Sequence, residues 1–335
     1  MDKQQWCLLV VADLKSISKD VYGIGDNPRY KFLSVNDQMA LYPEFSSLIP
    51  FNHFGRKNLG YLYAINSGAK RIWDFDDDNM GVVDVEEVLR SQPVTLCSPA
   101  QSRLVNPYMY FGVDETISWP RGFPLDSIRD EKTSNLVTCP AEIPSDKIAV
   151  IQSLANNEPD VDGIYRLTRK TPFNFKFNPH PLILPSNTFT PFNAQATMWY
   201  PRAFKFMYLP TTVHGRVSDI WRSYITEYFL GMTEQHVMFT KPYVVQDRNA
   251  HNYLSDFQSE SDLYLKSSGL VKFLQHRPSM GRIDGTDPRQ MHVEALRLYI
   301  DLYERDIIEE EDVLIYTYWL KHLGLPADGD LLFFL

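Results

Sequence analysis

The chain of 335 residues is 44% hydrophobic, which is enough to bury a large core in one or two domains. Its formal net charge of -9 argues against a nucleic-acid-binding protein, because phosphate binding needs a basic face. The three cysteines form no CxxC pair, so we expect buried thiols rather than a zinc site or a disulfide framework.

The N-terminal part of the sequence alternates strands and helices. Apolar runs over residues 6–13 and 29–35 predict two buried strands. A short helix follows the second strand and is stopped near Pro43, and a longer helix is predicted over 56–70. A third strand is predicted at "RIWDF", residues 71–75. Strand, helix and strand at this spacing indicate a βαβ unit with a parallel sheet.

The rest of the chain is predicted to be loop-rich and then helical. Residues 168–195 carry many Pro and Asn residues, which is typical of long connections. Residues 218–232 predict an amphipathic helix, and residues 287–324 predict two helices broken near Glu309 to Asp312. A linker near 280–286 separates these last helices from what precedes them.

The stretch "RIWDFDDDNM" places Asp74, Asp76, Asp77 and Asp78 at the end of a predicted strand. Ligands of α/β sheets bind beyond the carboxyl ends of the strands, and Asp13 ends the first strand in the same way. A cation would relieve the repulsion among these carboxylates. Mg²⁺ or Mn²⁺ held by carboxylates keeps open positions for a diphosphate.

The acidic stretch has two other interpretations. In an EF-hand, Asp74, Asp76 and Asp78 would fill loop positions one, three and five. However, Asn79 replaces the glycine at position six and Val85 replaces the glutamate at position twelve, which excludes that loop. A solvated acidic turn that binds nothing remains open.

Several long motifs resemble the STELLO-like glycosyltransferases, the DUF288 family. They are "RKNLGYLYAINSGAKRIWDFDDDN", "VNPYMYFG", "SWPRGFPLD", "IQSLANNEPDVDGIYRLTRK", "SDIWRSY" and "SGLVKFL", in this order along most of the chain. A weaker similarity extends to the plant reversibly glycosylated polypeptides, which are UDP-arabinose mutases. The resemblance implies an α/β fold of the GT-A type, a Rossmann-like mixed sheet flanked by helices. It also implies a DxD motif and a nucleotide-sugar donor.

By this resemblance the main domain, residues 1–285, binds the nucleotide sugar, and residues 286–335 form a C-terminal helical extension packed on it. Asp74 would face the ribose, and Asp76 and Asp77 would bind Mn²⁺ or Mg²⁺ and the diphosphate. The role of Asp78 stays open.

The resemblance also implies donor-binding residues elsewhere. Asp13 would hold the base and ribose with help from Lys15, although an ordinary turn Asp and a surface Lys are also consistent with the sequence. Arg56 and Lys57 begin a helix, where basic side chains oppose the dipole and suggest a charged partner such as a diphosphate. A solvated basic pair is the alternative.

A second group of candidates lies later in the chain. Arg121 in "WPRG" suits phosphate pairing beside a ring on which a sugar could stack, and a structural turn with a buried Trp is the alternative. His214 and Arg216 could contact the donor phosphates. Arg166 and Asn193 lie in family-like segments and could line the cleft.

Asp219 is the predicted catalytic base, by its match to the place of the base in GT-A enzymes. An inverting transferase needs a carboxylate that takes the proton of the acceptor hydroxyl. The alternative is that Asp219 only complements the dipole of a helix that Ser218 caps. His251 is a candidate third metal ligand, and a structural or exposed His is the alternative.

The sequence therefore predicts a metal-dependent, inverting glycosyltransferase that uses a nucleotide sugar, with a UDP-sugar as the expected donor and a glycan as acceptor. A nucleotide-sugar mutase and a non-catalytic scaffold of a glycan-synthesis complex are the alternatives. We expect no nucleic-acid partner, and an oligomer is compatible with the sequence.

The predicted location rests on targeting signals. No run of about 18 apolar residues is present, and the N-terminus does not resemble a signal peptide. With no N-x-[ST] sequon, we expect a soluble cytoplasmic protein. Because plant relatives are anchored in the Golgi membrane, a Golgi-lumenal catalytic domain separated from its anchor is the alternative.

Overall fold

The computed structural model describes residues 6–17, 19, 27–81, 92–97, 103–113, 117–176, 180–247, 252–278 and 288–324. The chain forms two compact units, and each is described by itself. The first comprises Met1–Lys70, Met207–Ser218 and Asp284–Leu335, and the second comprises Arg71–Phe206 and Asp219–Ile283. The C-terminal helices therefore group with the N-terminal segment, and the predicted boundary at 285/286 remains a prediction.

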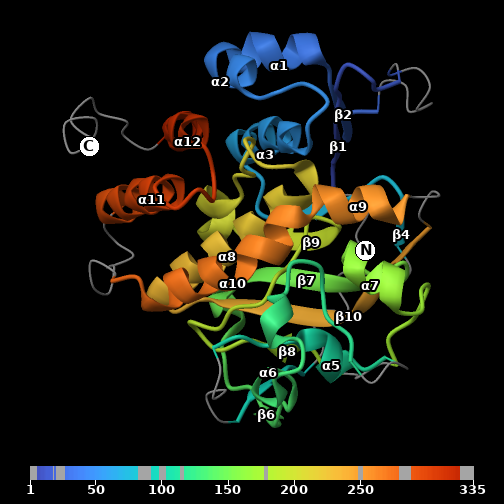
Figure 1. Ribbon diagram of the computed structural model, residues 1–335. Helices are drawn as coiled ribbons and strands as arrows, with labels where there is room; N and C mark the ends of the chain where they lie inside the picture. The colour runs from blue at the N-terminus through green and yellow to red at the C-terminus, as the bar shows by residue number, and fades with distance from the viewer. Residues whose placement is uncertain are drawn as a thin grey trace. The chain divides into compact units, whose positions relative to one another are not determined.

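The first unit combines a small parallel sheet with helices (Figure 1). Strand β1 (Leu8–Val11) pairs in parallel with β2 (Tyr30–Leu33), which confirms the first two predicted strands. Its helical elements are α1 (Val35–Leu41), α2 (Pro43–Leu48), the 3-10 turn η2 (Phe54–Arg56), α3 (Lys57–Asn66), α11 (Pro288–Tyr303) and α12 (Glu310–His322). The predicted break into two helices is confirmed, but it covers residues 304–309, and α12 already contains most of the predicted stretch Glu309 to Asp312.

Local sequence explains where α1 begins and how it is held. Ser34 Oγ accepts a hydrogen bond from the Asp37 amide at 3.1 Å, and Asp37 Oδ2 accepts from the Ser34 amide at 2.9 Å, forming a capping box. The Gln38 side chain donates to the carbonyl oxygens of Ala12 and Leu33 at 2.7 and 2.9 Å. It therefore ties the helix to the ends of both strands.

The second unit contains a mixed sheet of eight strands. Its order is β3-β9-β7-β10-β8-β5-β6, and β4 also pairs with β10. The strands are β3 (Ile72–Phe75), β4 (Asn79–Gly81), β5 (Val94–Leu96), β6 (Thr138–Pro140), β7 (Ile148–Asn157), β8 (Leu182–Ile183), β9 (Ala196–Trp199) and β10 (His236–Gln246). A mixed sheet with flanking helices confirms the predicted fold class and is consistent with a GT-A-like fold.

The predicted pairing of the third strand is wrong. β3 pairs antiparallel with β9, with Asp74 opposite Thr197, rather than in parallel with the first two strands. The local pattern of apolar residues marks a strand but does not identify its partner, and here the partner lies more than a hundred residues further along the chain.

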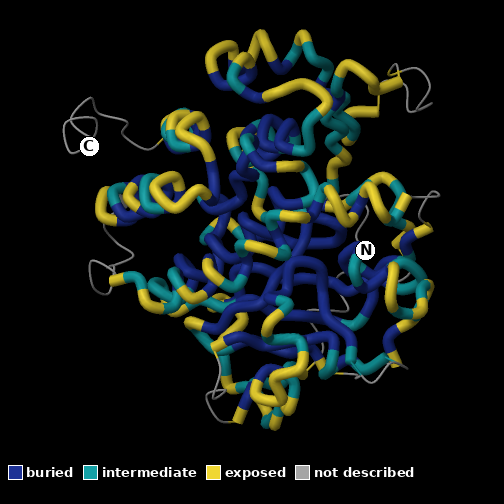
Figure 2. The backbone as a smooth tube through the Cα atoms, viewed as in Figure 1, coloured by how far each residue is buried: buried dark blue, intermediate teal, exposed yellow. Residues whose placement is uncertain are grey.

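Helices of the second unit include α8 from Asp219 onward, which confirms the predicted helix at 218–232 but begins one turn earlier, at Gly215 of the first unit. They are α5 (Pro107–Phe111), α6 (Glu131–Ser134), α7 (Gly163–Thr168), α8 (Gly215–Met232), α9 (Tyr253–Ser259) and α10 (Ser261–His276), with 3-10 turns at Leu125–Ser127, Ser145–Lys147 and Pro201–Phe206. Trp221 and Phe229 of α8 are completely buried, and most of this helix is dark blue in Figure 2. Such burial on several sides makes α8 a rigid support for polar side chains.

The expectation of buried thiols is wrong. Cys7 and Cys97 are exposed and Cys139 is half-buried. Cys97 follows β5. Cys139 lies on β6, the strand at the end of the sheet, which has a neighbouring strand on one side only.

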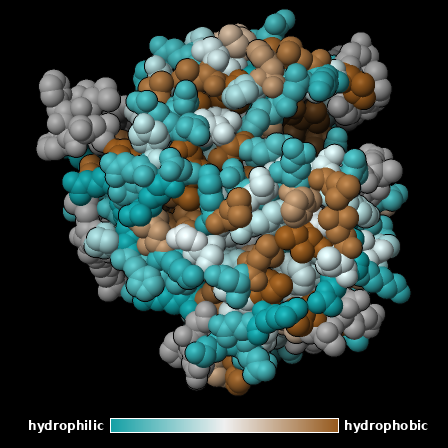
Figure 3. All heavy atoms as spheres, viewed as in Figure 1, coloured by the Kyte–Doolittle hydropathy of each residue, from teal (hydrophilic) through white to brown (hydrophobic). Residues whose placement is uncertain are grey.

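Figure 3 shows apolar side chains scattered among polar ones on the drawn face. Within the described ranges, no helix has the length and apolar character needed to cross a membrane.

Candidate functional site

The acidic turn, which we define as Asp76, Asp77 and Asp78, connects β3 to β4. The Asp76 amide donates to the Gln195 carbonyl oxygen at 3.3 Å, and the Asn79 amide donates to the Asp76 carbonyl oxygen at 3.3 Å. Asp77 is exposed, whereas Asp76 and Asp78 are half-buried. The turn thus keeps its carboxylates at different depths rather than presenting all of them to water.

Asp74 lies before this turn and points into the unit. Its side chain is 3% exposed, and its Oδ2 lies 3.4 Å from Nη1 of Arg222 on α8. The Arg222 guanidinium also lies over the Trp199 ring at 4.8 Å from the ring centre. This ion pair gives Asp74 a cation inside the protein, and the predicted ribose contact remains a prediction.

Asp78 makes a side-chain hydrogen bond to β10. Its Oδ2 accepts from the Gln246 side-chain amide at 2.9 Å. Its Oδ1, and Oδ1 of the adjacent Asn79, are buried atoms that find no hydrogen-bond partner among the described residues. Carboxylate and amide oxygens suit Mg²⁺ or Mn²⁺, so these atoms fit a divalent cation. The described residues nevertheless hold no cluster of three or more His, Cys, Asp or Glu side chains arranged for a metal.

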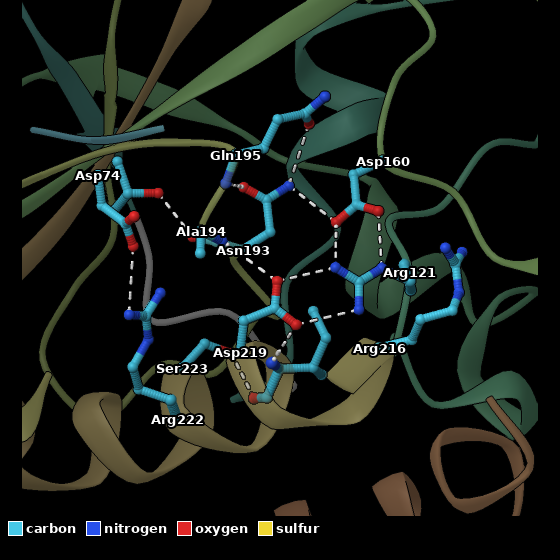
Figure 4. Close-up of polar contacts among 12 residues, drawn as sticks. Asp74, Arg121, Asp160, Asn193, Ala194, Gln195, Arg216, Asp219, Arg222 and Ser223 are labelled. Carbon is cyan, nitrogen blue, oxygen red and sulfur yellow. Dashed lines mark hydrogen bonds and ion pairs between the residues drawn. The ribbon is translucent and has the colours of Figure 1, made fainter. Parts of the chain in front are cut away.

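A second polar centre surrounds Arg121 (Figure 4). Arg121 Nε and Nη2 donate to Asp160 at 2.7 and 3.0 Å, and its Nη1 and Nη2 donate to Asp219 at 3.1 and 2.8 Å. We call Asp160, Arg121 and Asp219 the ion triad. Burial alone would lower the pKa of Arg121, but the two carboxylates raise it well above its ordinary value. Arg121 is therefore a permanent cation held between two anions.

The local backbone explains why "WPRG" can place Arg121 there. Trp119 is buried and its Nε1 donates to Asp162 Oδ2 at 2.6 Å. Gly122 has a φ of 81°, and a Cβ at this position would overlap Ile220 of α8. The Tyr224 hydroxyl donates to the Gly122 carbonyl oxygen at 2.9 Å. The glycine thus lets the turn approach α8 closely enough for the Arg121 side chain to reach Asp219.

Asp219, the predicted base, is 3% exposed and makes four hydrogen bonds as an acceptor. Besides the two bonds from Arg121, its Oδ1 accepts from the Ile220 amide at 3.0 Å and its Oδ2 accepts from the Ala194 amide at 3.2 Å. A carboxylate has about four acceptor positions, so this one is fully engaged. Ser218 does not cap the helix as considered above, because α8 begins at Gly215 and the Ser218 hydroxyl donates to Pro210.

Three buried amide side chains complete this region. Asn193, Gln195 and Gln246 are each less than 9% exposed. Asp160, Gln195 and Gln246 are the residues that sequence reasoning missed, whereas Asn193 is a predicted cleft residue without an assigned chemical role. The usable signal was a polar residue inside an apolar strand, as in "VVQD", and the quoted "PDVD" segment that contains Asp160.

The space inside this region is small. A cavity of about 10 Å³ lies among Arg121, Asp160, Asn193 and Gln195, with apolar walls that include Phe192. This volume is about that of one water molecule. The polar side chains therefore satisfy one another, and a ligand of sugar size would need them to separate.

Six predicted donor-binding residues lie in the first unit. Arg56 is 3% exposed, and its five N–H groups donate to Gln38, to the Ser46 hydroxyl and to the carbonyl oxygens of Ser46 and Ile49. This geometry holds α1, α2 and the start of α3 together. Burial lowers the pKa of Arg56, while the charge of Asp13 raises it.

The other five donor candidates lie closer to the surface. The Asp13 carboxylate accepts from the Leu14 amide at 2.7 Å and so closes a local turn. The Lys57 ammonium lies 4.7 Å from the centre of the Phe54 ring, and Lys15 is exposed. His214 Nδ1 accepts from the Arg216 amide at 3.2 Å at the start of α8.

Two further candidates complete the list. His251 lies outside the described residues. Arg166 pairs with Glu158 and donates to the Pro159 carbonyl oxygen at 3.0 Å, which fixes the segment before α7.

Comparison with known proteins identifies the family. Residues 216–326, which include Asp219 and Gln246, match the family model of STELLO glycosyltransferases. The chain is 33% identical over 260 residues to the probable glycosyltransferase STELLO2 of Arabidopsis thaliana, covering 72% of the chain and 33% of the relative. It is 28% identical over 354 residues to the probable glycosyltransferase STELLO1 of the same plant, covering 96% of the chain and 44% of that relative. The chain thus spans less than half the length of these curated relatives. The motifs, the mixed α/β fold and these matches together place the chain in the STELLO-like glycosyltransferase family.

Proposed function

We propose that the protein is a metal-dependent glycosyltransferase that takes a sugar from a UDP-sugar donor and transfers it to a glycan acceptor with inversion. The names of the two relatives support glycosyl transfer. The observation that carries the metal-dependent part is the acidic turn after β3, where Asp78 and Asn79 each keep a buried oxygen without a protein partner among the described residues.

The acidic turn would hold the metal. Asp76 and Asp77 are the predicted ligands, and the geometry adds Asp78, while His251 stays a candidate. Bound Mn²⁺ or Mg²⁺ would offset the negative charge of the departing nucleotide diphosphate. The chain's own contribution is to fix the turn, through the Gln195 carbonyl oxygen and the Gln246 side chain.

The donor-binding roles of Asp13, Lys15, Lys57, His214 and Arg216 are part of this proposal. Arg56 is the weakest of the donor candidates, because its N–H groups already donate within the first unit. We expect the Arg56 guanidinium to stabilise the first unit rather than to bind the donor.

Asp219 can act as the base only when Arg121 releases it. Both Asp219 oxygens accept from Arg121, and a carboxylate so engaged has no position for the hydroxyl of an acceptor. This observation favours one alternative, a non-catalytic scaffold that keeps the fold and the acidic turn. A donor that draws Arg121 away would restore the catalytic interpretation.

The first test is calorimetric titration of UDP with and without Mn²⁺. We expect binding by the wild type that depends on Mn²⁺ and is lost in Asp76→Asn/Asp77→Asn. The matched control is Glu310→Gln/Glu311→Gln, which removes two exposed carboxylates of α12 and should bind as the wild type does. The absence of UDP binding by the wild type would refute a UDP-sugar donor.

A second test separates transfer from scaffolding and from mutase activity. UDP-sugars are incubated with and without glycan acceptors, and the products are resolved by mass and chromatography. A sugar transferred to an acceptor supports the proposal, and an isomerised UDP-sugar without acceptor supports a mutase. UDP binding with neither product supports the scaffold.

A further inference from the structure

Three amide side chains form a continuous path between the ion triad and the acidic turn. The Asn193 side-chain amide donates to Asp160 Oδ2 at 2.8 Å and to Gln195 Oε1 at 3.4 Å. The Gln195 amide donates to Gln246 Oε1, and the Gln246 amide donates to Asp78 Oδ2 at 2.9 Å. We call Asn193, Gln195 and Gln246 the amide relay.

From Asn193 to Asp78 the relay has a single direction, and at its other end the Asn193 nitrogen also donates to Asp160. Each amide accepts from the previous one through its oxygen and donates to the next through its nitrogen, and the last donor reaches the Asp78 carboxylate. Hydrogen bonds in such a chain polarise one another, and a charged acceptor at the end strengthens the last of them. Because the three amides are less than 9% exposed, water does not substitute easily for a lost partner.

A further amide fixes the orientation of the first member. Gln152 on β7 donates to Asn193 Oδ1 at 3.0 Å, and its own oxygen accepts from the Asn193 backbone amide at 3.1 Å and the Thr197 hydroxyl at 2.8 Å. Asn193 Nδ2 is thereby directed towards Asp160 and Gln195. The orientation of one amide consequently determines that of the next.

We propose that the amide relay couples the acidic turn to the ion triad, with Gln246 as the positioning residue for Asp78. A change in the charge of the triad would then alter the order of the turn through these amides. The functional meaning of this coupling rests on the proposed function. A cation at the acidic turn and an anion that competes for Arg121 would influence each other through these amides.

The coupling is tested by hydrogen exchange of the full chain without any ligand, read by mass spectrometry on peptides that cover residues 74–81. Gln246→Met keeps the length of the side chain and removes its amide. We expect it to raise exchange at the amides of Asp76 and Asn79 about tenfold, which corresponds to the loss of one hydrogen bond. Asp160→Asn should raise exchange at the same two amides several-fold, and Arg121→Lys provides a second variant at that end.

Two comparisons make the result specific to the relay. Glu227→Gln changes a more deeply buried carboxyl group, 3% exposed, whose oxygens accept from the Thr190 amide outside the relay, so exchange at 74–81 should stay unchanged. In the Gln246→Met background, Asp160→Asn should cause no further change there. The proposal is overturned if Asp160→Asn and Arg121→Lys alter exchange only around the triad, or if Glu227→Gln has the same effect as Asp160→Asn.

This experiment is independent of the proposed function. Failure of UDP and Mn²⁺ binding would refute the donor and metal and leave the exchange result intact. Normal binding together with unchanged exchange at 74–81 would refute the relay alone.

Discussion

Replacing Arg121 with Met should be among the most damaging single changes in the second unit. The substitution keeps an apolar stem and removes four hydrogen bonds, two to Asp160 and two to Asp219. It leaves two neighbouring carboxylates whose side chains are 14% and 5% exposed. Breaking a buried ion pair from one side costs about 3–5 kcal/mol because the remaining charge is desolvated and uncompensated.

The same substitution should make stability strongly dependent on pH. Without the guanidinium, two neighbouring carboxylates remain desolvated and repel each other at neutral pH. Acidic conditions that neutralise carboxylates would remove this repulsion. The deficit of Arg121→Met relative to the wild type should therefore shrink at acidic pH.

The assay is urea unfolding followed by tryptophan fluorescence, at pH 7 and at acidic pH, with hydrogen exchange to assign the transition to the second unit. Arg202→Met is the control, since Arg202 donates to the carbonyl oxygens of Ile148 and Ser145 and pairs with no carboxylate in these bonds. We expect it to cost about 1 kcal/mol with little dependence on pH. A cost below about 1 kcal/mol for Arg121→Met, or a cost independent of pH, would refute the reasoning about the ion triad.

Three further predictions concern stability. Gly122→Ala should cost about 1–3 kcal/mol in urea unfolding, because of its φ of 81° and the overlap of a Cβ with Ile220; an unchanged midpoint would contradict the close approach. Asp312→Ala should cost at least about 3 kcal/mol, since it orphans the hydroxyls of Tyr208, Thr211 and Thr212 and two backbone amides; Asp312→Asn should recover part of this loss. Burial raises the pKa of Asp162 from 3.8 to about 6, although its two hydrogen bonds lower it. Its contribution to the free energy of unfolding is therefore present below pH 3.8 and decreases by about 3 kcal/mol as the pH rises towards 6. Asp162→Asn should flatten that part of the stability profile, and an unchanged profile would contradict the raised pKa.

Elements with a strong local pattern could be predicted from the sequence. The apolar periodicity of residues 218–232 predicts α8, and the sequence of residues 287–324 predicts the two helices α11 and α12. The partner of β3 could not be predicted, because pairing with β9 depends on how the whole second unit folds. For the same reason the order of the strands in the mixed sheet could not be predicted from the sequence.

The candidate site was predicted in part. Asp219 and Arg121 were both singled out, but for separate roles, and no local signal indicates that they form an ion pair across 98 positions. Asp160, Gln195 and Gln246 were missed because an amide or a carboxylate in isolation has no recognisable spacing motif. Their importance arises from contacts between segments that are distant in the sequence.

The hydrogen bonds of Asp312 have a consequence for synthesis on the ribosome. The first unit is discontinuous, and its segment Met207–Ser218 is anchored by a carboxylate of α12, about a hundred residues closer to the C-terminus. Chains emerge from their N-terminus and domains fold as units during translation. Residues 71–206 thus leave the ribosome before the partners of Tyr208 and Thr211 exist, and the first unit to begin synthesis is the last to be completed.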